Sequence, residues 1–164
     1  MPLQIRSLRR ADASAFLEVH RASIHGLAAG DYSSDVIMAW APLPVTAEAV
    51  SALLRDWNHE FRIIAEDDGR AVGVGALSVE KAELTACYVS PADCSRGVGT
   101  AITNRLEETA RSAGIEFLEL NSSITAQRFY QRRGYEIVAR GEHRLSSGQA
   151  MEAIRMRKRL VPSS

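Results

Sequence analysis

The sequence lacks excess charge of either sign, cysteine-rich motifs and long hydrophobic runs. Lys and Arg number 20, as do Asp and Glu, so an extended nucleic-acid or acidic-membrane interface is disfavoured. Only two cysteines occur, Cys87 and Cys94, in neither a C-x-x-C pair nor a disulfide framework, and the four histidines are scattered, so no metal site is expected. No stretch approaches the roughly 20 apolar residues of a membrane span. No apolar signal-peptide core follows the N-terminus either, so we expect a reduced, cytoplasmic protein.

The composition that remains is that of an ordinary folded domain. The 164 residues are 46% hydrophobic and 24% charged, with 5 Pro and 11 Gly. A chain of this length and hydrophobic content buries a sufficient core by itself. The sequence therefore predicts a single domain spanning residues 1–164.

Hydrophobic periodicity predicts a mixed α/β fold. In the first half, strand-like segments at 3–8, 61–65 and 71–79 surround helical segments after Asp12, within 25–45 and after Thr46. Gly73 and Gly75 inside the third of these strands indicate a bulge or a close approach by another backbone.

The second half contains one strand–helix–strand unit. A strand at 83–89, a helix at 99–113 and a strand at 115–120 predict a parallel pair joined by a right-handed crossover. A short helix around Ala126, Phe129 and Tyr130 follows. The chain is then expected to finish with strands at 135–139 and through Met151, Ile154 and Met156.

A glycine-bearing loop, Cys94 to Thr100, connects the strand at 83–89 to the helix. Successive backbone N–H groups and the positive helix end meet there, which is typical of a phosphate site, and Arg96 and Thr100 add a cation and a hydroxyl. The loop matches neither the G-x-x-x-x-G-K-[S/T] motif nor the dinucleotide-binding fingerprint. Taken alone, a tight turn that requires two glycines explains it equally well.

Three segments considered together give a more specific signal than the loop alone. Val89-Ser-Pro91, Arg96-Gly97-Val-Gly99-Thr100 and Ser123-x-x-Ala-x-x-Phe-Tyr-x-x-x-Gly-Tyr135 resemble, in order and spacing, the signature of the GNAT superfamily of N-acetyltransferases. The resemblance covers residues 82–140. Cys94 stands where family members usually carry Arg or Gln, and Ser123 where they usually carry Asn.

The resemblance implies a GNAT-like α/β fold with acetyl-coenzyme A as co-substrate. It implies a mixed, mostly antiparallel sheet of about six to seven strands with about four helices, opened between two splayed parallel strands. The expected parts are an acceptor-shaping part at 1–60, a coenzyme A-binding core at 61–140 and a C-terminal strand at 141–164. The implied cofactor-binding residues are Cys87, Tyr88, Val89, Cys94, Ser95, Arg96, Gly97, Val98, Gly99, Thr100, Ser123, Ala126 and Phe129.

Acetyl transfer to an amine requires a group that takes the amine proton. Glu83 is the candidate base, because it begins the strand on which the resemblance places the thioester. A surface glutamate paired with Lys81 is the alternative reading, and Glu119 or a water relay could replace Glu83. The resemblance also makes Tyr130 the candidate proton donor to the departing thiolate, whereas a packed aromatic residue is its structural interpretation.

The first part of the chain is expected to form the acceptor site. His25, Tyr32 and Trp40 are its candidate substrate-binding residues, together with Glu119, although the aromatic residues would also suit a core. The predicted activity is transfer of acetyl to a primary amine of a small molecule or peptide by direct attack. The alternative is a non-catalytic acyl-coenzyme A sensor or interaction domain. A homodimer is compatible with the sequence, which shows no isolated apolar seam.

Overall fold

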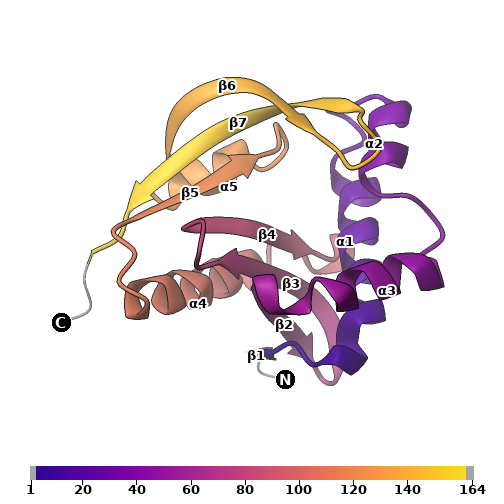
Figure 1. Ribbon diagram of the computed structural model, residues 1–164, viewed down its shortest axis with the longest axis horizontal. Coiled ribbons are helices and arrows are strands. Elements are labelled where there is room, and N and C mark those ends of the chain that lie inside the picture. The colour runs from indigo at the N-terminus through magenta and orange to yellow at the C-terminus, as the bar shows by residue number, and fades with distance from the viewer. Residues whose placement is uncertain (1–2, 162–164) are drawn as a thin grey trace.

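One seven-stranded sheet organises the molecule (Figure 1). The computed structural model describes residues 3–161, so the outermost residues of the predicted domain, 1–2 and 162–164, lie outside the described residues. The strand order is β1-β2-β3-β4-β5-β7-β6. The strands are β1 (Leu3–Ser7), β2 (Phe61–Asp67), β3 (Arg70–Ser78), β4 (Glu83–Val89), β5 (Phe117–Ser122), β6 (Glu136–Arg144) and β7 (Ala150–Arg159).

Five α-helices pack around this sheet. They are α1 (Ala13–Leu27), α2 (Ser34–Trp40), α3 (Ala47–Arg55), α4 (Val98–Ser112) and α5 (Gln127–Arg132). Side-chain caps start two of them where the sequence offers a hydroxyl: Ser33 accepts from the Val36 N–H, and Thr46 from the Ala49 N–H. The predicted mixed α/β fold, with about four helices and six to seven strands, is confirmed.

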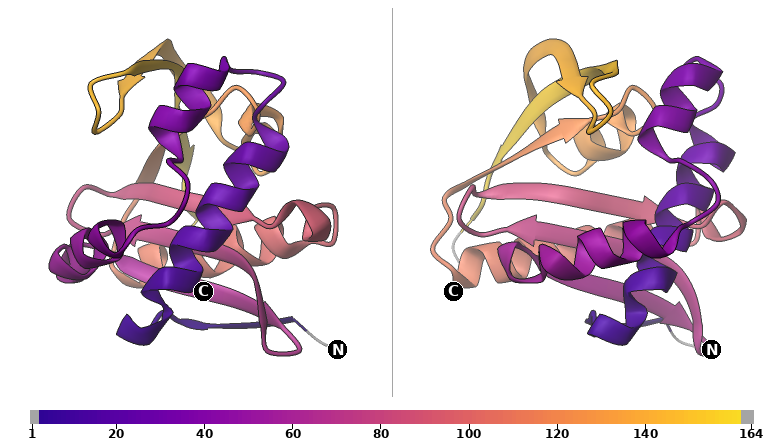
Figure 2. Two further views of the ribbon diagram at one scale, coloured as in Figure 1. Left: turned by 90° about the vertical axis from the view of Figure 1, so that its right-hand side faces the viewer. Right: turned by 45° about the vertical axis from the view of Figure 1, so that its right-hand side comes forward.

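The sheet opens between β4 and β5. All other neighbouring strands are antiparallel, whereas β4 and β5 are parallel and share the single register pair Glu83↔Glu119. A further backbone bond, from the Glu119 N–H to the Ala82 carbonyl, lies at the same end. Beyond it the strands diverge, and β5, β7 and β6 form an arm that rises away from β4 (Figures 1 and 2). The predicted splay is therefore present.

Two strand boundaries differ from the sequence prediction. The strand expected at 115–120 begins only at Phe117, because Gly114 has φ +81° and Ile115 is still bonded through its N–H to the Ala110 carbonyl. The strand expected at 135–139 extends to Arg144, because it pairs along most of β7. Its residues are all exposed, so hydrophobic periodicity could not mark its length.

Helix α4 lies directly on β3. A Cβ added at Gly73 would stand 2.7 Å from the Ile102 Cδ1, and one at Gly75 would stand 2.5 Å from the Ile102 Cγ2. The two glycines therefore serve close approach, and a bulge adjoins the first of them, because the register shift at Ala65/Glu66 leaves Val72, the residue before Gly73, as the extra residue of β3. This contact fixes the start of α4 beside the end of β4.

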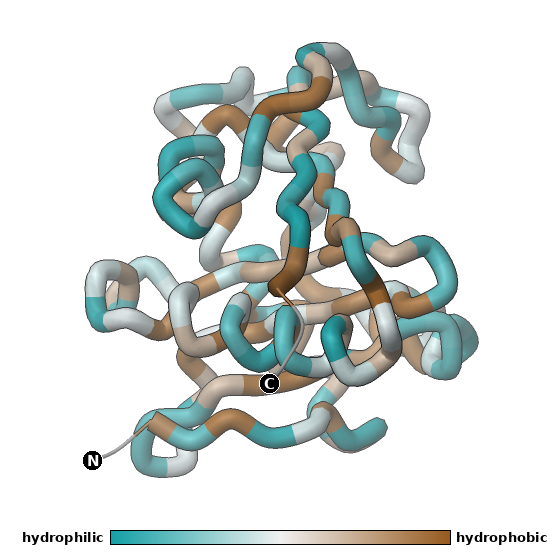
Figure 3. The backbone as a smooth tube through the Cα atoms, turned by 90° about the vertical axis from the view of Figure 1, so that its left-hand side faces the viewer, coloured by the Kyte–Doolittle hydropathy of each residue, from teal (hydrophilic) through white to brown (hydrophobic). Residues whose placement is uncertain are grey.

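The two faces of the first four strands carry different helices (Figure 2). On one face α4 packs on Ile63 and Leu77; on the other, Phe16 and Val19 of α1 pack on Ile64. The α4 core continues into the arm through buried residues of β5, β7 and the α5 region, namely Leu118, Leu120, Tyr130, Tyr135, Ile154 and Met156. Figure 3 shows these hydrophobic stretches running through both halves of the molecule, with hydrophilic turns between them.

Candidate active site

Two adjoining cavities occupy the opening between β4 and the arm. The larger has a volume of about 420 Å³ and extends from the loop before α4 to the second half of α1. The smaller, of about 240 Å³, lies between β4 and the β6–β7 hairpin. Their common wall consists of Trp40, Cys87, Tyr88, Ser123, Ala126 and Tyr130. The two cavities therefore meet at a shared set of side chains.

The loop at 94–100 lies at one end of the larger cavity, and its backbone conformation suits an anion. Ser95 and Gly97 both have left-handed φ values, +72° and +79°, and the 15-residue helix α4 begins at Val98. A Cβ at Gly97 would meet no atom within 4 Å, so glycine is required there by backbone conformation and not by space. The first N–H groups of α4 are directed towards the cavity end, where the helix dipole favours a negative group.

The short helix α5 packs beside this loop. The ring of Phe129 would lie 3.2 Å from a Cβ at Gly99, so a larger residue at position 99 would push α5 away. Arg133, the residue that follows α5, also donates to the Asn104 amide oxygen of α4. These contacts hold α5 beside the first turns of α4.

Nearly all the predicted cofactor-binding residues line the larger cavity. They are Cys87, Tyr88, Val89, Cys94, Ser95, Gly97, Val98, Gly99, Thr100, Ser123, Ala126 and Phe129. The structure adds four residues from α1 and its C-terminal cap, Ser23, Ile24, Leu27 and Ala28, and two from the segment that follows β5, Thr125 and Arg132. The α1 residues carry no motif, so sequence reasoning missed them.

Arg96 is the exception among the predicted cofactor contacts. Its guanidinium donates to Asp93 at 2.5 Å and to Asp67 at 2.7 Å, and it is not among the residues lining the cavity. The almost fully buried carboxylate of Asp93 also receives two bonds from Arg70, at 2.9 and 3.0 Å. Arg70 and, to a smaller extent, Arg96 lower the pKa of Asp93. In this structure Arg96 ties the loop to the β2–β3 hairpin.

Tyr130 lies at the junction of the two cavities. Its side chain is buried and packs edge-to-face against Phe129 and Tyr135, with ring centroids 5.3 and 5.6 Å away. Its hydroxyl makes no hydrogen bond within residues 3–161. Burial raises the pKa of Tyr130 well above 10, so the hydroxyl keeps its proton throughout the physiological range.

A hydrogen-bonded cluster of Tyr135, Glu107 and Lys158 adjoins Tyr130, because the ring of Tyr135 packs against it. The Tyr135 hydroxyl donates to Glu107 at 3.0 Å, and Lys158 donates to the other carboxylate oxygen at 2.8 Å. The Tyr135 N–H also bonds to the Tyr130 carbonyl at 3.0 Å. These contacts connect α4, α5 and β7, and thereby fix the ring of Tyr130.

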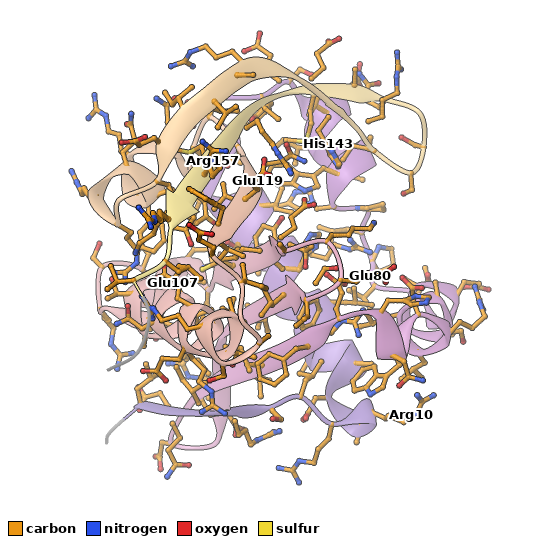
Figure 4. All side chains as sticks on the ribbon, turned by 60° about the vertical axis from the view of Figure 1, so that its left-hand side comes forward. Arg10, Glu80, Glu107, Glu119, His143 and Arg157 are labelled. Atoms are coloured by element: carbon orange, nitrogen blue, oxygen red, sulfur yellow. The ribbon has the colours of Figure 1, made fainter. Side chains whose placement is uncertain are left out.

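Glu83 is the only carboxylate that lines either cavity in the described part of the chain. Arg155 of β7 stands between it and Glu119, with its NH1 3.5 Å from a Glu83 oxygen and its Nε 3.1 Å from a Glu119 oxygen. Glu119 does not line either cavity; it projects from the arm beside Arg157 (Figure 4). The alternative partner of Glu83, Lys81, forms no ion pair with it; Arg155 takes that place instead.

The predicted acceptor residues of the first part are only partly brought together. Trp40 lines both cavities. Tyr32 packs edge-to-face on Trp40 at 5.8 Å but lines neither; its hydroxyl accepts from the Ile124 N–H at 2.8 Å and donates to the Glu152 carbonyl at 2.7 Å. His25 is bonded to the Ala41 carbonyl at 2.7 Å and also lies outside both cavities.

The C-terminal hairpin supplies a wall that sequence reasoning missed. His143, Met151 and Ala153 line the smaller cavity, and His143 and Met151 are register partners on β6 and β7. Figure 4 shows His143 on this hairpin and Glu80 across the opening, on the turn between β3 and β4. The remaining lining residues come from β4 and β5, namely Leu84, Thr85, Ala86, Asn121 and Ser122. No local pattern joins these segments, because they meet only through the fold.

Among residues 3–161, no three His, Cys, Asp or Glu side chains gather in a metal-binding cluster. None of the helices described here has the length and hydrophobicity needed to cross a bilayer. Both cysteines are free thiols, and burial raises the pKa of Cys87 to about 12.

Solved structures resemble this fold over nearly its whole length. A GCN5-related N-acetyltransferase from Rhodopseudomonas palustris is 28% identical with a TM-score of 0.88, covering 98% of this chain and 97% of that one. The PaiA N-acetyltransferase of Thermoplasma acidophilum, solved with coenzyme A, is 21% identical with a TM-score of 0.76, covering 97% and 99%. The second likeness, at its lower identity, concerns the fold alone.

Sequence comparisons agree. An uncharacterized acetyltransferase of Streptococcus pyogenes is 30% identical over 105 residues, which are 60% of this chain and 70% of that protein. The family model for the acetyltransferase (GNAT) domain matches residues 28–160, which include the loop at 94–100 and every lining residue of both cavities except Ser23, Ile24 and Leu27. The chain therefore belongs to the GNAT family of acetyltransferases, with acetyl-coenzyme A as its co-substrate.

Proposed function

We propose that this protein transfers the acetyl group of acetyl-coenzyme A to a primary amine of a small molecule or peptide by direct attack. The observation that carries the proposal is the difference in lining between the two adjoining cavities. The larger has a loop suited to an anion and a mostly apolar and hydroxyl-bearing lining with one cation, Arg132, whereas the smaller has one carboxylate, Glu83. Tyr130 lies in the wall between them.

The cofactor position follows from the larger cavity. The pyrophosphate would sit at the loop 94–100, and the pantetheine arm would run past Val89 and Phe129 towards the common wall. Beyond the register pair at Glu83, β4 is not paired to β5, so backbone N–H groups around Cys87 to Val89 are available to a thioester carbonyl. Such donors stabilise the oxyanion of the tetrahedral intermediate.

The amine would enter through the smaller cavity. An alkylammonium of pKa about 10.4 must lose a proton before it attacks, and Glu83 is the base that the cavity offers, directly or through a water molecule. The nitrogen then bonds to the carbonyl carbon while the carbon–sulfur bond breaks. Tyr130 gives its proton, or a hydrogen bond, to the leaving sulfur.

The walls of the smaller cavity favour an acceptor with one ammonium on an apolar stem. Trp40, Met151 and Ala153 present hydrophobic surface, and a single carboxylate matches a single cation. A polycationic acceptor is disfavoured, because Arg155 already pairs with both Glu83 and Glu119. The raised pKa of Cys87 also argues against an acetyl-cysteine intermediate, since its thiolate would be scarce. A reducing, cytoplasmic setting belongs to this proposal because both thiols are free.

The test is a panel of primary amines incubated with the protein and acetyl-coenzyme A. Free thiol is followed over time, and the acceptor is examined by mass spectrometry for an added acetyl group. Thiol release that depends on an amine, together with an acetylated product, supports the proposal. Tight binding of acetyl-coenzyme A without turnover on any amine would instead indicate a sensor or interaction domain.

A further inference from the structure

Arg132 is the one charged side chain lining the larger cavity, within the residues that the structure describes. The other lining residues are apolar, hydroxyl-bearing, thiol-bearing or glycine. Coenzyme A carries a pyrophosphate and a 3′-phosphate, so it brings several negative charges to this cavity. A cation at the cavity wall is the natural partner for one of these groups.

The placement of Arg132 follows from the docking of α5. Phe129, one turn earlier on the same helix face, packs against Gly99, and Arg133 donates to Asn104 of α4. These contacts hold α5 alongside the start of α4. Arg132 is thereby brought to the wall of the cavity that the loop 94–100 also lines.

The side chain of Arg132 is exposed and free to bind an anion. It forms no ion pair and no side-chain hydrogen bond with the rest of residues 3–161. Arg96, the cation expected from the loop sequence, is in the opposite situation, because Asp93 and Asp67 both hold it outside the cavity. To bind a cofactor phosphate, Arg96 would have to break two charge-assisted bonds, whereas Arg132 would break none.

We infer that Arg132, and not Arg96, supplies the cationic contact to a phosphate group of coenzyme A. The inference rests on the proposed placement of the cofactor in the larger cavity. Arg96 then acts on the loop from outside, by tying it to Asp67 and Asp93. The phosphate that Arg132 binds is either part of the pyrophosphate or the 3′-phosphate, and the two are separable by experiment.

The experiment is calorimetric titration of coenzyme A and dephospho-coenzyme A into the unsubstituted protein, Arg132→Gln and Arg96→Gln. Arg132→Gln is expected to weaken coenzyme A binding by about tenfold or more at low salt, and to flatten the dependence of affinity on salt. Arg96→Gln removes the tie between the loop and Asp67 and Asp93 but no group that lines the cavity, so it is expected to lose less affinity than Arg132→Gln. Arg132→Lys should retain part of the affinity, because it keeps the charge but not the bidentate geometry.

The dephospho compound identifies the phosphate. If Arg132 binds the 3′-phosphate, Arg132→Gln weakens coenzyme A binding but leaves dephospho-coenzyme A binding unchanged. If it binds the pyrophosphate, both ligands lose affinity to the same degree. The inference is overturned if Arg132→Gln binds both ligands as the unsubstituted protein does, or if Arg96→Gln loses more affinity than Arg132→Gln. Melting temperatures establish that the variants are folded, and failure of the unsubstituted protein to bind coenzyme A would contradict the proposed function itself.

Discussion

The larger cavity, which we propose as the cofactor cavity, and the smaller, which we propose as the acceptor cavity, share a wall but are built in different ways. The cofactor cavity is bounded at one end by one continuous loop at 94–100, whose shape is set by its backbone conformation and by the start of α4. The acceptor cavity is lined by side chains from α2, β4, β5, α5 and the β6–β7 hairpin. The difference teaches that a site made by local backbone geometry carries a sequence signature, whereas one assembled from distant side chains does not.

The two cavities also differ in the charge of their lining residues. Arg132 lines the first and Glu83 the second, each being the sole Asp, Glu, Lys or Arg of its lining among residues 3–161. An anionic donor and a cationic acceptor would thus be drawn to opposite sides of the wall that holds Tyr130. Substitutions on each side should therefore separate cofactor binding from chemistry.

The largest expected effect comes from the shared wall. Tyr130→Phe keeps the buried ring, so the melting temperature should change little, but it removes the proton for the leaving thiolate. We expect kcat to fall by about 10²- to 10⁴-fold with acceptor KM nearly constant, measured by steady-state thiol release. A fall below about fivefold in a folded variant would leave Tyr130 with a packing role only.

Tyr135→Phe is the matched control for Tyr130. It removes the hydroxyl that bonds to Glu107 and so weakens the buried group behind the wall. We expect a lower melting temperature, from the loss of about 1–3 kcal/mol when a buried acceptor loses a donor, but a much smaller change in kcat than Tyr130→Phe gives. Equal losses of kcat in the two variants would contradict a specific role for the Tyr130 hydroxyl.

The acceptor side is tested by Glu83→Gln. We expect turnover to fall by about 10²-fold near neutral pH and by less at high pH, where more of the amine is already neutral, while coenzyme A affinity holds. Rates over a pH series with a fixed amine check this. Glu119→Gln, which removes the other partner of Arg155, should change turnover by no more than about threefold. If Glu119→Gln shows the larger, pH-dependent loss, Glu119 is the base.

The cofactor side is tested by Gly97→Asp. The substitution forces a side chain into a left-handed backbone, which costs about 1–2 kcal/mol, and adds negative charge beside the expected pyrophosphate. We expect coenzyme A affinity to fall by about tenfold or more in a calorimetric titration. Gly114→Asp places the same residue in the same conformation at the far end of α4, and should leave affinity unchanged. Equal affinity in both variants would show that the anion sits elsewhere.

The smallest expected effect concerns His20, which packs against Tyr88 of the common wall. His20 packs edge-on against Tyr88 at 4.5 Å, and burial lowers the pKa of His20 from 6.5 to about 3. Between these values the unfolded chain binds a proton that the folded chain does not, so stability should fall as pH drops below about 6.5. His20→Gln removes this contribution.

The measurement is the melting temperature at pH 7 and pH 5. The loss on acidification should be smaller in His20→Gln than in the unsubstituted protein by about 2–4 °C, the change that about 1 kcal/mol produces in a protein of this size. An equal loss in both proteins would mean that another group is responsible for the acid sensitivity.

The sequence by itself determined the order of helices and strands and the position of the loop at 94–100. Periodicity placed the βαβ unit from Glu83 onwards, and Gly97 and Gly99 marked the loop because a left-handed φ and a close helix approach each demand glycine. The helix around Phe129 and Tyr130 was also readable from its apolar face. These features depend on residues close together in the chain, so a local pattern is enough to predict them.

Only the tertiary structure decided which side chains face the cavities. Arg96 follows the loop pattern, yet two carboxylates from outside the loop turn it away, while Arg132 enters from α5. Tyr32 was predicted to bind the acceptor, but its hydroxyl instead bonds to the backbone of β7. His143 lines the smaller cavity only because β6 pairs with β7 beyond its expected end. Side-chain direction depends on contacts between segments far apart in sequence, and periodicity within one segment contains no information about them.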